Sequence, residues 1–500
     1  MMRSMFSSVS GLKAHQTKMD VIGNNIANIN TIAFKSSTVS FQEVFSQTLK
    51  NSGVADANSG RGGSNPMQIG LGISIAAIDT IQTSGSLQRT DNTTDLAING
   101  SGFFVVMDGL TGEYRFTRAG NFGIDQAGNL VTTGGLYVCG WQEFINEDKT
   151  EFDTGLYATP INIYKHNGID TQQTAPKATT RAVLSGNLNA GNKALSDIVN
   201  ETTGTKYTPL PSSGVDMDTL TEVGYVTEEF VVPYVMYDDQ GNSKTVNVVF
   251  IKNQITQDSN GLDQTEWFWY AIDPDTQKKI ENWYKEQEDP TTEEFTEDMK
   301  IDPKEVKPDQ GVLVFDSKGK LVSVEPKSDL NKEGKFCVDI KGIPKMDGSE
   351  EVPHYLDFSG LTQYKADNSV KATSVDGYPA GRLVSFSINE DGIIMGTYSN
   401  GVQQPLAQIS LAYFDNPAGL EKVGTNLYRV TTNSGTFDNR GYKPGSGNVG
   451  TISSGILEMS NVDLSKEFIE MITTQRGFQA NSKIISTTDE MLQDLVNLKR

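Results

Sequence analysis

SNVDLSKEFIEMITTQRGFQANSKIISTTDEMLQDLVNLKR, residues 460–500, contains no proline, and Gly477 is its one glycine. Its apolar residues recur at steps of three, four or seven, which is the spacing that places side chains on one seam of a long helix. Asp463 suits the N-cap position of that helix. The predicted seam consists of Leu464, Phe468, Met471, Phe478, Ile485, Leu492 and Val496. So narrow an apolar stripe requires a partner that covers it.

The partner that the sequence offers lies at the other end of the chain, in residues 4–30, SMFSSVSGLKAHQTKMDVIGNNIANIN. Its apolar residues also follow a heptad, with two isoleucines beside the main stripe. The predicted seam is Leu12, Met19, Ile22, Ile26 and Ile29. We expect the two terminal helices to pair as a coiled coil, so that the rest of the chain is inserted between them. The alternative is that each helix packs on a nearby sheet domain.

Bulk composition narrows the class of protein. A net charge of −21 argues against nucleic acid or an anionic membrane as the main partner. No apolar run approaches the length of a membrane span, so we expect no membrane insertion. The N-terminus lacks the apolar core and cleavage site of a standard secretory signal. The two cysteines, Cys139 and Cys337, both lie in strand-like apolar runs and are expected to be small buried residues.

The order of patterns along the chain predicts a mixed, mainly β fold with nested, discontinuous domains. Turn signals such as Asp239-Gln240-Gly241-Asn242 separate short apolar runs that we interpret as strands. The predicted organisation is a helical coiled-coil domain of residues 1–30 plus 460–500, a connector of 31–70, a β-rich middle domain of 71–145 plus 375–450, and an inserted β-rich domain of 146–374 with an acidic excursion at 281–310.

Nothing in the sequence recommends a catalytic site. The three histidines, His15, His166 and His354, have no paired metal-binding spacing. Abundant carboxylates alone do not indicate a glycosidase pair. We therefore predict no catalytic residues, no cofactor and no bound metal, and expect that the protein is not an enzyme.

Both ends resemble the flagellar rod and hook protein family. SNVDLSKEFIEMITTQRGFQANSKIISTTDEML is similar to the C-terminal signature of that family, and GSGFFVVMDG and YRFTRAGNF agree with its inner β domain. The long insert is more similar to hook than to rod members. The residues that resemble the N-terminal signature are Asn24, Asn25, Ala27, Asn28, Thr31 and Phe34.

The resemblance implies a structural subunit that polymerises with itself into a curved helical tube, the extracellular hook, which transmits torque from the basal body to the filament. It also implies export by the flagellar type III apparatus, and contacts with a hook cap, the distal rod and hook–filament junction proteins. The alternatives are a distal-rod or hook-associated axial protein, or a secreted adhesin or surface enzyme. Phe41 and Phe45 resemble an export-gate element, or else they anchor the connector on a neighbouring domain.

Overall fold

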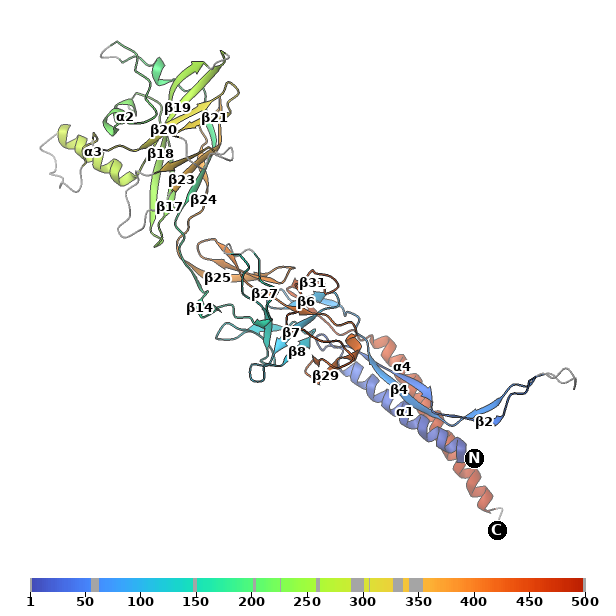
Figure 1. The fold of residues 1–500 in the computed structure, drawn as a ribbon. Coiled ribbons are helices and arrows are strands. Elements are labelled where there is room, and N and C mark those ends of the chain that lie inside the picture. The colour runs from blue at the N-terminus through green and yellow to red at the C-terminus, as the bar shows by residue number, and fades with distance from the viewer. Residues whose placement is uncertain are drawn as a thin grey trace. The chain divides into compact units, whose positions relative to one another are not determined.

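The computed structural model describes residues 2–54, 63–146, 151–200, 204–224, 226–257, 261–288, 301–304, 306–326, 336–340 and 354–497. The chain divides into two compact units: unit 1 comprises Met1–Gln172, Leu383–Tyr398 and Val402–Arg500, and unit 2 comprises Gln173–Arg382 and Ser399–Gly401. The fold is mainly β, with one long helix near each end of the chain (Figure 1). The fold class predicted from the sequence is confirmed.

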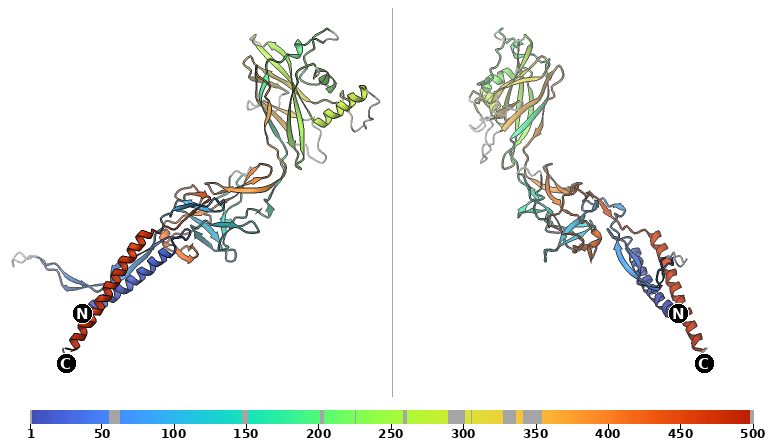
Figure 2. Two further views of the ribbon diagram at one scale, coloured as in Figure 1. Left: turned by 180° about the vertical axis from the view of Figure 1, so that it is seen from behind. Right: turned by 45° about the vertical axis from the view of Figure 1, so that its right-hand side comes forward.

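The two terminal helices of unit 1 pair antiparallel. Helix α1 (Met2–Ala27) lies beside α4 (Leu464–Asn497) in Figure 1 and in both views of Figure 2. Lys18 of α1 forms an ion pair with Glu470 of α4, with 3.3 Å between Nζ and Oε2. The neighbouring Asn25 donates a hydrogen bond to Glu467. Lower numbers on one helix therefore meet higher numbers on the other, as in an antiparallel pair.

Residues 31–70, expected to form a connector, carry strands of their own. Strand β1 (Ser37–Glu43) pairs antiparallel with β4 (Ile73–Thr80), and both pack against α1. Strand β2 (Ser46–Lys50) pairs antiparallel with β3 (Met67–Gly70). Backbone pairing satisfies the N–H and C=O groups of these polar segments without a large apolar core.

The β body of unit 1 interleaves strands from both halves of the chain. The order of its main sheet is β25-β26-β27-β11-β7-β8-β30-β29. Phe103–Met107 forms β7, and its first four residues are buried because alternate side chains enter cores on opposite faces of the sheet. The other strands of this sheet are β8 (Tyr114–Thr117), β9 (Phe122–Ile124), β10 (Leu130–Thr132), β11 (Tyr137–Trp141), β12 (Thr159–Pro160), β25 (Gly381–Ile388), β26 (Ile393–Tyr398), β27 (Gln403–Ile409), β28 (Leu411–Ala412), β29 (Glu421–Gly424) and β30 (Leu427–Arg429).

Short strand pairs close unit 1 between this sheet and the helices. Strand β31 (Thr451–Ser454) pairs with β6 (Leu96–Asn99), and β32 (Ile456–Glu458) pairs with β5 (Leu87–Arg89). A small hairpin joins β13 (Lys165–His166) to β14 (Ile169–Asp170), and a 3₁₀ turn, η4, spans Pro417–Gly419. Ahead of α4, Glu458 and Asn461 form backbone hydrogen bonds with Ala33 and Phe34, which follow α1. The start of α4 therefore lies next to the segment after α1.

Unit 2 is built on two sheets whose facing side chains form one core. One sheet has the order β17-β18-β19-β20-β21 and the other the order β22-β23-β16-β24. The elements of unit 2 are β15 (Gln173–Thr174), β16 (Arg181–Asn189), η1 (Leu195–Asp197), α2 (Met217–Gly224), β17 (Phe230–Tyr237), β18 (Ser243–Gln257), β19 (Asp263–Ile272), α3 (Pro274–Glu288), β20 (Asp309–Phe315), β21 (Leu321–Glu325), β22 (Cys337–Ile340), β23 (His354–Tyr364) and β24 (Lys371–Val375).

Strand β19 shows why the five-stranded sheet is apolar on both faces. Trp267 and Trp269 enter the core between the sheets, whereas Phe268 and Tyr270 enter a second core with α2 residues. The turn at 239–242 joins β17 to β18, as predicted. Of the acidic excursion 281–310, residues up to Glu288 belong to α3, and 289–300 and 305 lie outside the described residues.

The inserted unit begins later in the chain than the sequence suggested. Unit 2 starts at Gln173 and ends its long segment at Arg382, not at 146 and 374. The reason is that Ile161 and Ile163 are buried in a core of unit 1, and that β12 pairs with β11 through Cys139 and Pro160. Residues 151–172 therefore pack with the β body of unit 1.

Candidate functional site

Most of the buried side chains of the α1–α4 pair are small or polar. The residues of α1 that are buried are Ser8, Gly11, Ala14, Ile22 and Asn25. Those of α4 are Glu467, Thr474 and Thr488. Together with Asn481, these three α4 positions form one heptad row. The row that faces α1 is therefore polar.

Two glycines allow the helices to approach closely. A Cβ atom on Gly11 would lie 2.7 Å from Nδ2 of Asn481, and one on Gly477 would lie 2.9 Å from the ring of His15. Separations under 3.0 Å do not occur between real Cβ atoms and their neighbours without movement. Burial and the nearby Lys18 lower the pKa of His15, which keeps its imidazole neutral near pH 7.

The predicted apolar seam requires a correction, because only part of it turns toward the helix pair. Met471, Phe478, Ile485 and Leu492 are half-buried, but Leu464, Phe468 and Val496 are exposed. On the N-terminal side Ile22 is buried, Leu12, Met19 and Ile26 are half-buried, and Ile29 lies in the turn after α1. The physical reason is that the glycines and the polar heptad row permit a closer helix contact than the bulky apolar stripe would.

The sides of the helices that face away from the pair carry many apolar side chains. Phe468 is 49% exposed, Ile469 62% and Ile472 56%. The other exposed apolar residues of the helices are Met2, Phe6, Val9, Leu464, Ile484, Met491 and Val496. Exposed apolar side chains that gather on one surface mark an interaction site.

Where the helices meet the β body, three charged side chains are buried together. We call Lys35, Arg118 and Glu458 the basal cluster. Nζ of Lys35 donates to Oε1 of Glu458 at 2.6 Å and to the carbonyl of Thr83 at 2.7 Å. Nη1 of Arg118 lies 3.6 Å from Oε2 of Glu458. The exposed fractions of these side chains are 0%, 3% and 0% for Lys35, Arg118 and Glu458.

The basal cluster holds two cations against one carboxylate. Burial lowers the pKa values of Lys35 and Arg118, and the attraction of Glu458 offsets only part of this effect. The backbone N–H of Gly85 also donates to Oε1 of Glu458, at 2.9 Å. Glu458 lies on β32 and therefore links this strand to Lys35, which follows α1, and to Gly85, which precedes β5.

Two asparagines tie the chain ends together around this cluster. The amide of Asn25 exchanges hydrogen bonds with the backbone of Ser37, with Ser37 N–H to Oδ1 at 3.0 Å and Nδ2 to the Ser37 carbonyl at 2.9 Å. Nδ2 of Asn25 also donates to Glu467 at 3.2 Å. Asn461 accepts from the backbone N–H of Ser36 at 2.8 Å and donates to the carbonyl of Ile81 at 2.9 Å.

The other signature residues stabilise the end of α1. Nδ2 of Asn28 donates to the carbonyl of Asn24 at 2.9 Å, and Thr31 donates to Oδ1 of Asn28 at 3.0 Å. Such side-chain bonds replace the backbone partners that are missing at a helix end. Nζ of Lys422 lies 5.2 Å from the ring of Phe34, and Ala27 is exposed.

The two phenylalanines of the export-gate candidate have different surroundings. Phe41 lies in β1, and its ring centroid is 5.6 Å from that of His15 on α1. Phe45 follows β1 and is 64% exposed. The structure thus places Phe41 against the terminal helix and leaves Phe45 open to solvent.

Candidate metal ligands do not gather anywhere in the part of the chain that the structure describes. Among the described residues, no group of three or more His, Cys, Asp and Glu side chains could hold a metal ion. Cys139 and Cys337 are both buried, as predicted from the sequence. No helix within the described ranges has the length and apolar character needed to cross a membrane.

Sequence reasoning missed the basal cluster and the polar heptad row. Charged residues such as Lys35 and Glu458 normally indicate solvated positions, so no local signal singles them out. Glu467, Thr474, Asn481 and Thr488 do recur at intervals of seven, and that regularity could have shown a second row.

Comparison with known proteins matches this architecture to flagellar families. Four family models match: "Flagella basal body rod protein" at residues 5–35, "Flagellar hook protein FlgE/F/G D1 domain" at 97–173, "Flagellar basal body protein FlaE D2 domain" at 212–378, and "Flagellar basal body rod FlgEFG protein C-terminal" at 453–498. The chain has paired terminal helices around inserted β domains, and all four matching models describe flagellar axial proteins. Fold and matches together indicate the class of flagellar axial proteins.

The full-length relatives narrow this class. The chain is 35% identical to the flagellar hook protein FlgE of Treponema pallidum and 34% identical to that of Borreliella burgdorferi, in each case over 100% of both chains. It is 33% identical to the Escherichia coli flagellar hook protein over 98% of this chain and 99% of that one. A crystal structure of Helicobacter pylori flagellar hook protein FlgE2 aligns with 74% of this chain and all of that one, at 17% identity and a TM-score of 0.45.

The chain belongs to the flagellar hook protein family. It is a structural subunit of the flagellar hook and a self-polymerising component of the flagellum. Full-length similarity to hook proteins supports none of the alternatives considered from the sequence, namely a rod protein, a hook-associated protein, an adhesin or a surface enzyme.

Proposed function

We propose that copies of this chain polymerise through the outward-facing apolar sides of α1 and α4, which form the inner tube of the hook. The observation that carries this proposal is the inverted distribution of side chains on the helix pair. Its internal contact buries Glu467, Thr474 and Thr488, whereas Ile469 and Ile472 are left exposed. Apolar side chains gain free energy when they leave water, and a neighbouring copy would supply that cover.

The energetics favour assembly over an independent helix pair. Fully burying one isoleucine or phenylalanine contributes about 1.5–3 kcal/mol. Several such side chains per subunit, repeated along a tube, offset the entropy lost when the helices are held in place. The polar heptad row between the two helices contributes less free energy than these apolar contacts. We therefore infer that the terminal helices are less ordered in the monomer and gain order on polymerisation.

The assembled tube would act as a universal joint between the basal body and the filament. A head-to-tail contact that does not close into a ring generates a helical polymer. Bending of such a tube requires contacts that exchange partners as subunits slide. Outside the apolar sides of α1 and α4, the net charge of −21 suits exchangeable contacts between the outer parts of neighbouring subunits.

We also propose the finer partners that membership of the hook family suggests. They are the flagellar type III export apparatus, the hook cap, the distal rod and the hook–filament junction proteins. The protein would work without a cofactor, catalysis, nucleic acid or insertion into a membrane. Phe45 is the better candidate for contact with the export gate because it is 64% exposed, whereas Phe41 is 36% exposed and packs on His15.

Two substitutions at adjacent positions of α4 test the polymerisation surface. Ile472→Gln should leave the circular dichroism of the monomer unchanged and raise the critical concentration for tube formation, seen by negative-stain microscopy. Loss of about 1.5–3 kcal/mol per subunit corresponds to roughly a tenfold to hundredfold rise. Thr473→Gln introduces the same side chain at an exposed polar position and should leave the critical concentration near that of the wild type. Equal values for both variants would remove the basis of the proposal.

The export candidate requires a different measurement. Phe45→Ala should reduce secretion of the subunit from cells while the purified variant still forms tubes. Normal secretion with weakened tubes would instead assign Phe45 to subunit contacts, and normal results in both assays would remove it from the proposal.

A further inference from the structure

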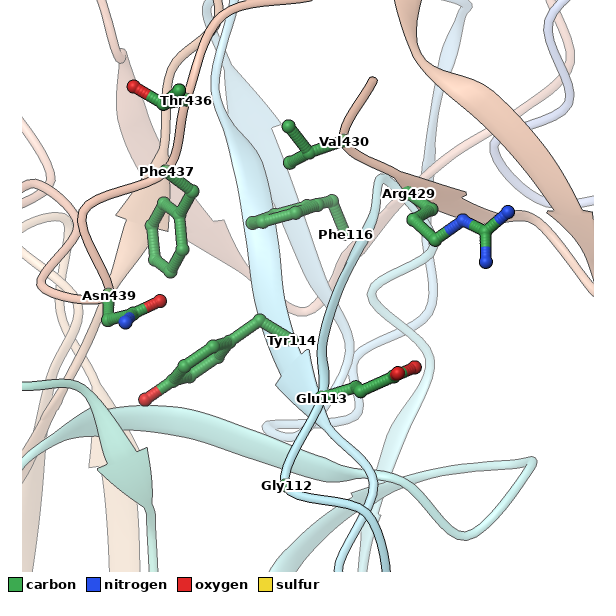
Figure 3. Close-up of a pocket in the computed structure, with 9 residues that line it drawn as sticks. All are labelled: Gly112, Glu113, Tyr114, Phe116, Arg429, Val430, Thr436, Phe437 and Asn439. Carbon is green, nitrogen blue, oxygen red and sulfur yellow. The ribbon is translucent and has the colours of Figure 1, made fainter. Parts of the chain in front are cut away.

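Unit 1 contains a surface groove with an aromatic floor, which we call the aromatic groove. Its volume is about 470 Å³, and Figure 3 shows the side chains that surround it. The rings of Tyr114 and Phe437 have centroids 5.4 Å apart, and those of Phe116 and Phe437 are 5.0 Å apart. The lining consists of Gly112, Glu113, Tyr114, Phe116, Arg429, Val430, Thr436, Phe437 and Asn439.

The groove combines a fixed apolar floor with a charged rim. Tyr114 is held by a 2.9 Å hydrogen bond from its hydroxyl to the carbonyl of Ala158, and burial raises its pKa, so the phenol stays neutral. In Figure 3 the side chains of Glu113 and Arg429 extend away from the ring of Phe437. Glu113 pairs with Arg115 at 3.2 Å and Arg429 pairs with Glu421 at 2.7 Å, so the rim carries two ion pairs beside an apolar cavity.

The hairpin formed by β13 and β14 presents a matching apolar side chain. Its tip residues, Asn167 and Gly168, have φ angles of 49° and 81°, the left-handed values that a two-residue hairpin turn requires. The strands pair Lys165 with Asp170 and His166 with Ile169. Ile169 is 69% exposed although the turn fixes its position.

Further contacts hold this hairpin in place. Nδ2 of Asn167 donates to Oε1 of Glu143 at 2.5 Å, and Nε2 of His166 lies 3.8 Å from Oε2 of the same carboxylate. The hydroxyl of Thr171 donates to the carbonyl of Ile163 at 2.7 Å. Ile169 is thus an ordered apolar projection, and binding it would cost little conformational entropy.

We propose that Ile169 of one copy inserts into the aromatic groove of a neighbouring copy in the polymer. The proposal rests on polymerisation of this chain and adds a specific contact between the β bodies of two copies. Charged side chains surround both surfaces. Lys165 and Asp170 lie beside the isoleucine, and Glu113 and Arg429, each in an ion pair of its own chain, lie on the rim of the groove, where they could exchange partners. Because the projection and the groove are different surfaces of one chain, the contact is heterologous and does not close on itself.

Other exposed apolar residues of unit 1 suit the groove less well. Leu110 is 98% exposed but belongs to the turn that forms the rim of the groove itself. Val384 is 70% exposed and lies within β25, where neighbouring strand residues limit how far it projects. Of these three, Ile169 is the one directly after a hairpin tip, with a cation and an anion beside it.

Cross-linking between single-cysteine variants tests the contact. Ile169→Cys and Thr436→Cys chains are mixed, polymerised, oxidised and analysed on a non-reducing gel. The native cysteines give little background, because Cys139 is 0% and Cys337 is 3% exposed and burial raises the pKa of Cys139 to about 12. We expect a covalent dimer in mixed tubes and none in the unpolymerised mixture. Val384→Cys, mixed with Thr436→Cys, is the matched control.

The outcomes separate this contact from the proposed function. Tubes that form normally but give no more dimer than the control would overturn the contact and leave polymerisation intact. Failure of the wild-type chain to form tubes would overturn polymerisation, and the contact with it. If Ile169→Cys alone blocks tube formation while Val384→Cys does not, that result supports a role for Ile169.

A charge exchange provides a second measurement on tubes without cysteine variants. Asp170→Arg and Arg429→Asp should each raise the critical concentration, by up to about fivefold for an exposed ion pair. Glu421→Gln is the control for the ion pair that Arg429→Asp also breaks within its own chain. The double variant should recover most of the loss, since the two charges are exchanged across the contact. Additive losses in the double variant would show that Asp170 and Arg429 do not meet.

Discussion

Replacement of Glu458 is the sharpest test of how the chain ends are held together. Glu458→Gln removes the one anion of the basal cluster and leaves Lys35 and Arg118 buried without a counter-charge. Removing one member of a buried, hydrogen-bonded ion pair costs about 3–5 kcal/mol. The same change also disturbs the acceptor of the Gly85 N–H, so we place the loss of unfolding free energy in the upper half of that range.

Lys35→Met is the comparison that isolates the role of charge. This variant leaves one cation and one anion, because Arg118 remains 3.6 Å from Glu458. The carbonyl of Thr83 loses its ammonium donor, but no uncompensated charge stays buried. We therefore expect a smaller loss of unfolding free energy, about 3 kcal/mol. The double variant Lys35→Met with Glu458→Gln should cost less than the sum of the two single losses, as residues in contact do.

Urea titration of protein labelled with fluorotryptophan measures these losses. Trp141 lies in unit 1, whereas Trp267, Trp269 and Trp283 lie in unit 2, so fluorine resonances report the two units separately. With a slope of about 2 kcal/mol per M urea, a loss of about 4 kcal/mol lowers the midpoint for unit 1 by about 2 M. The unit 2 midpoint is the internal control. A midpoint for Glu458→Gln equal to or above that of Lys35→Met would refute the charge argument.

Two further predictions concern the buried His354 and the close helix contact at Gly477. Burial lowers the pKa of His354 to about 4, below its unfolded value, so the stability of unit 2 is full above about pH 6.5 and falls as the pH drops toward 4. Wild-type unit 2 should lose about 2 kcal/mol between pH 7 and pH 5 relative to His354→Gln, measured by urea titration. Gly477→Ala should weaken the α1–α4 contact because its Cβ meets His15, whereas Gly23→Ala, with nothing within 4 Å, should stabilise α1 by about 0.5–1 kcal/mol. Helix content against temperature distinguishes the two glycine variants, and equal behaviour would contradict the close approach at Gly477.

Local sequence signals were sufficient for the helices and hairpins. The absence of proline from 460–500 and the heptad spacing predicted α4, and the Asp239–Asn242 turn predicted the β17–β18 hairpin. Such features depend on residues close together in the chain, so pattern and turn chemistry identify them. The nested order of the patterns also indicated that the ends meet.

Which side of α4 packs against α1 could not be predicted in the same way. Apolar periodicity shows that a helix has an apolar side, but not whether that side meets the same chain or another copy. Phe468 follows the predicted seam and is 49% exposed, while the polar Thr474 is 3% exposed. The close approach at Gly477 decides this facing, and it depends on the helix that lies opposite.

By itself, the sequence determined a mainly β protein with two terminal helices, without a recognisable catalytic motif, and similar to flagellar axial proteins. Only the tertiary structure decided which residues join the ends. Lys35 and Glu458 are separated by 423 positions, and Asn25 and Glu467 by 442. A charged or amide side chain becomes a buried partner only when folding removes water from it and supplies a counter-group, and neither condition is visible in a linear pattern.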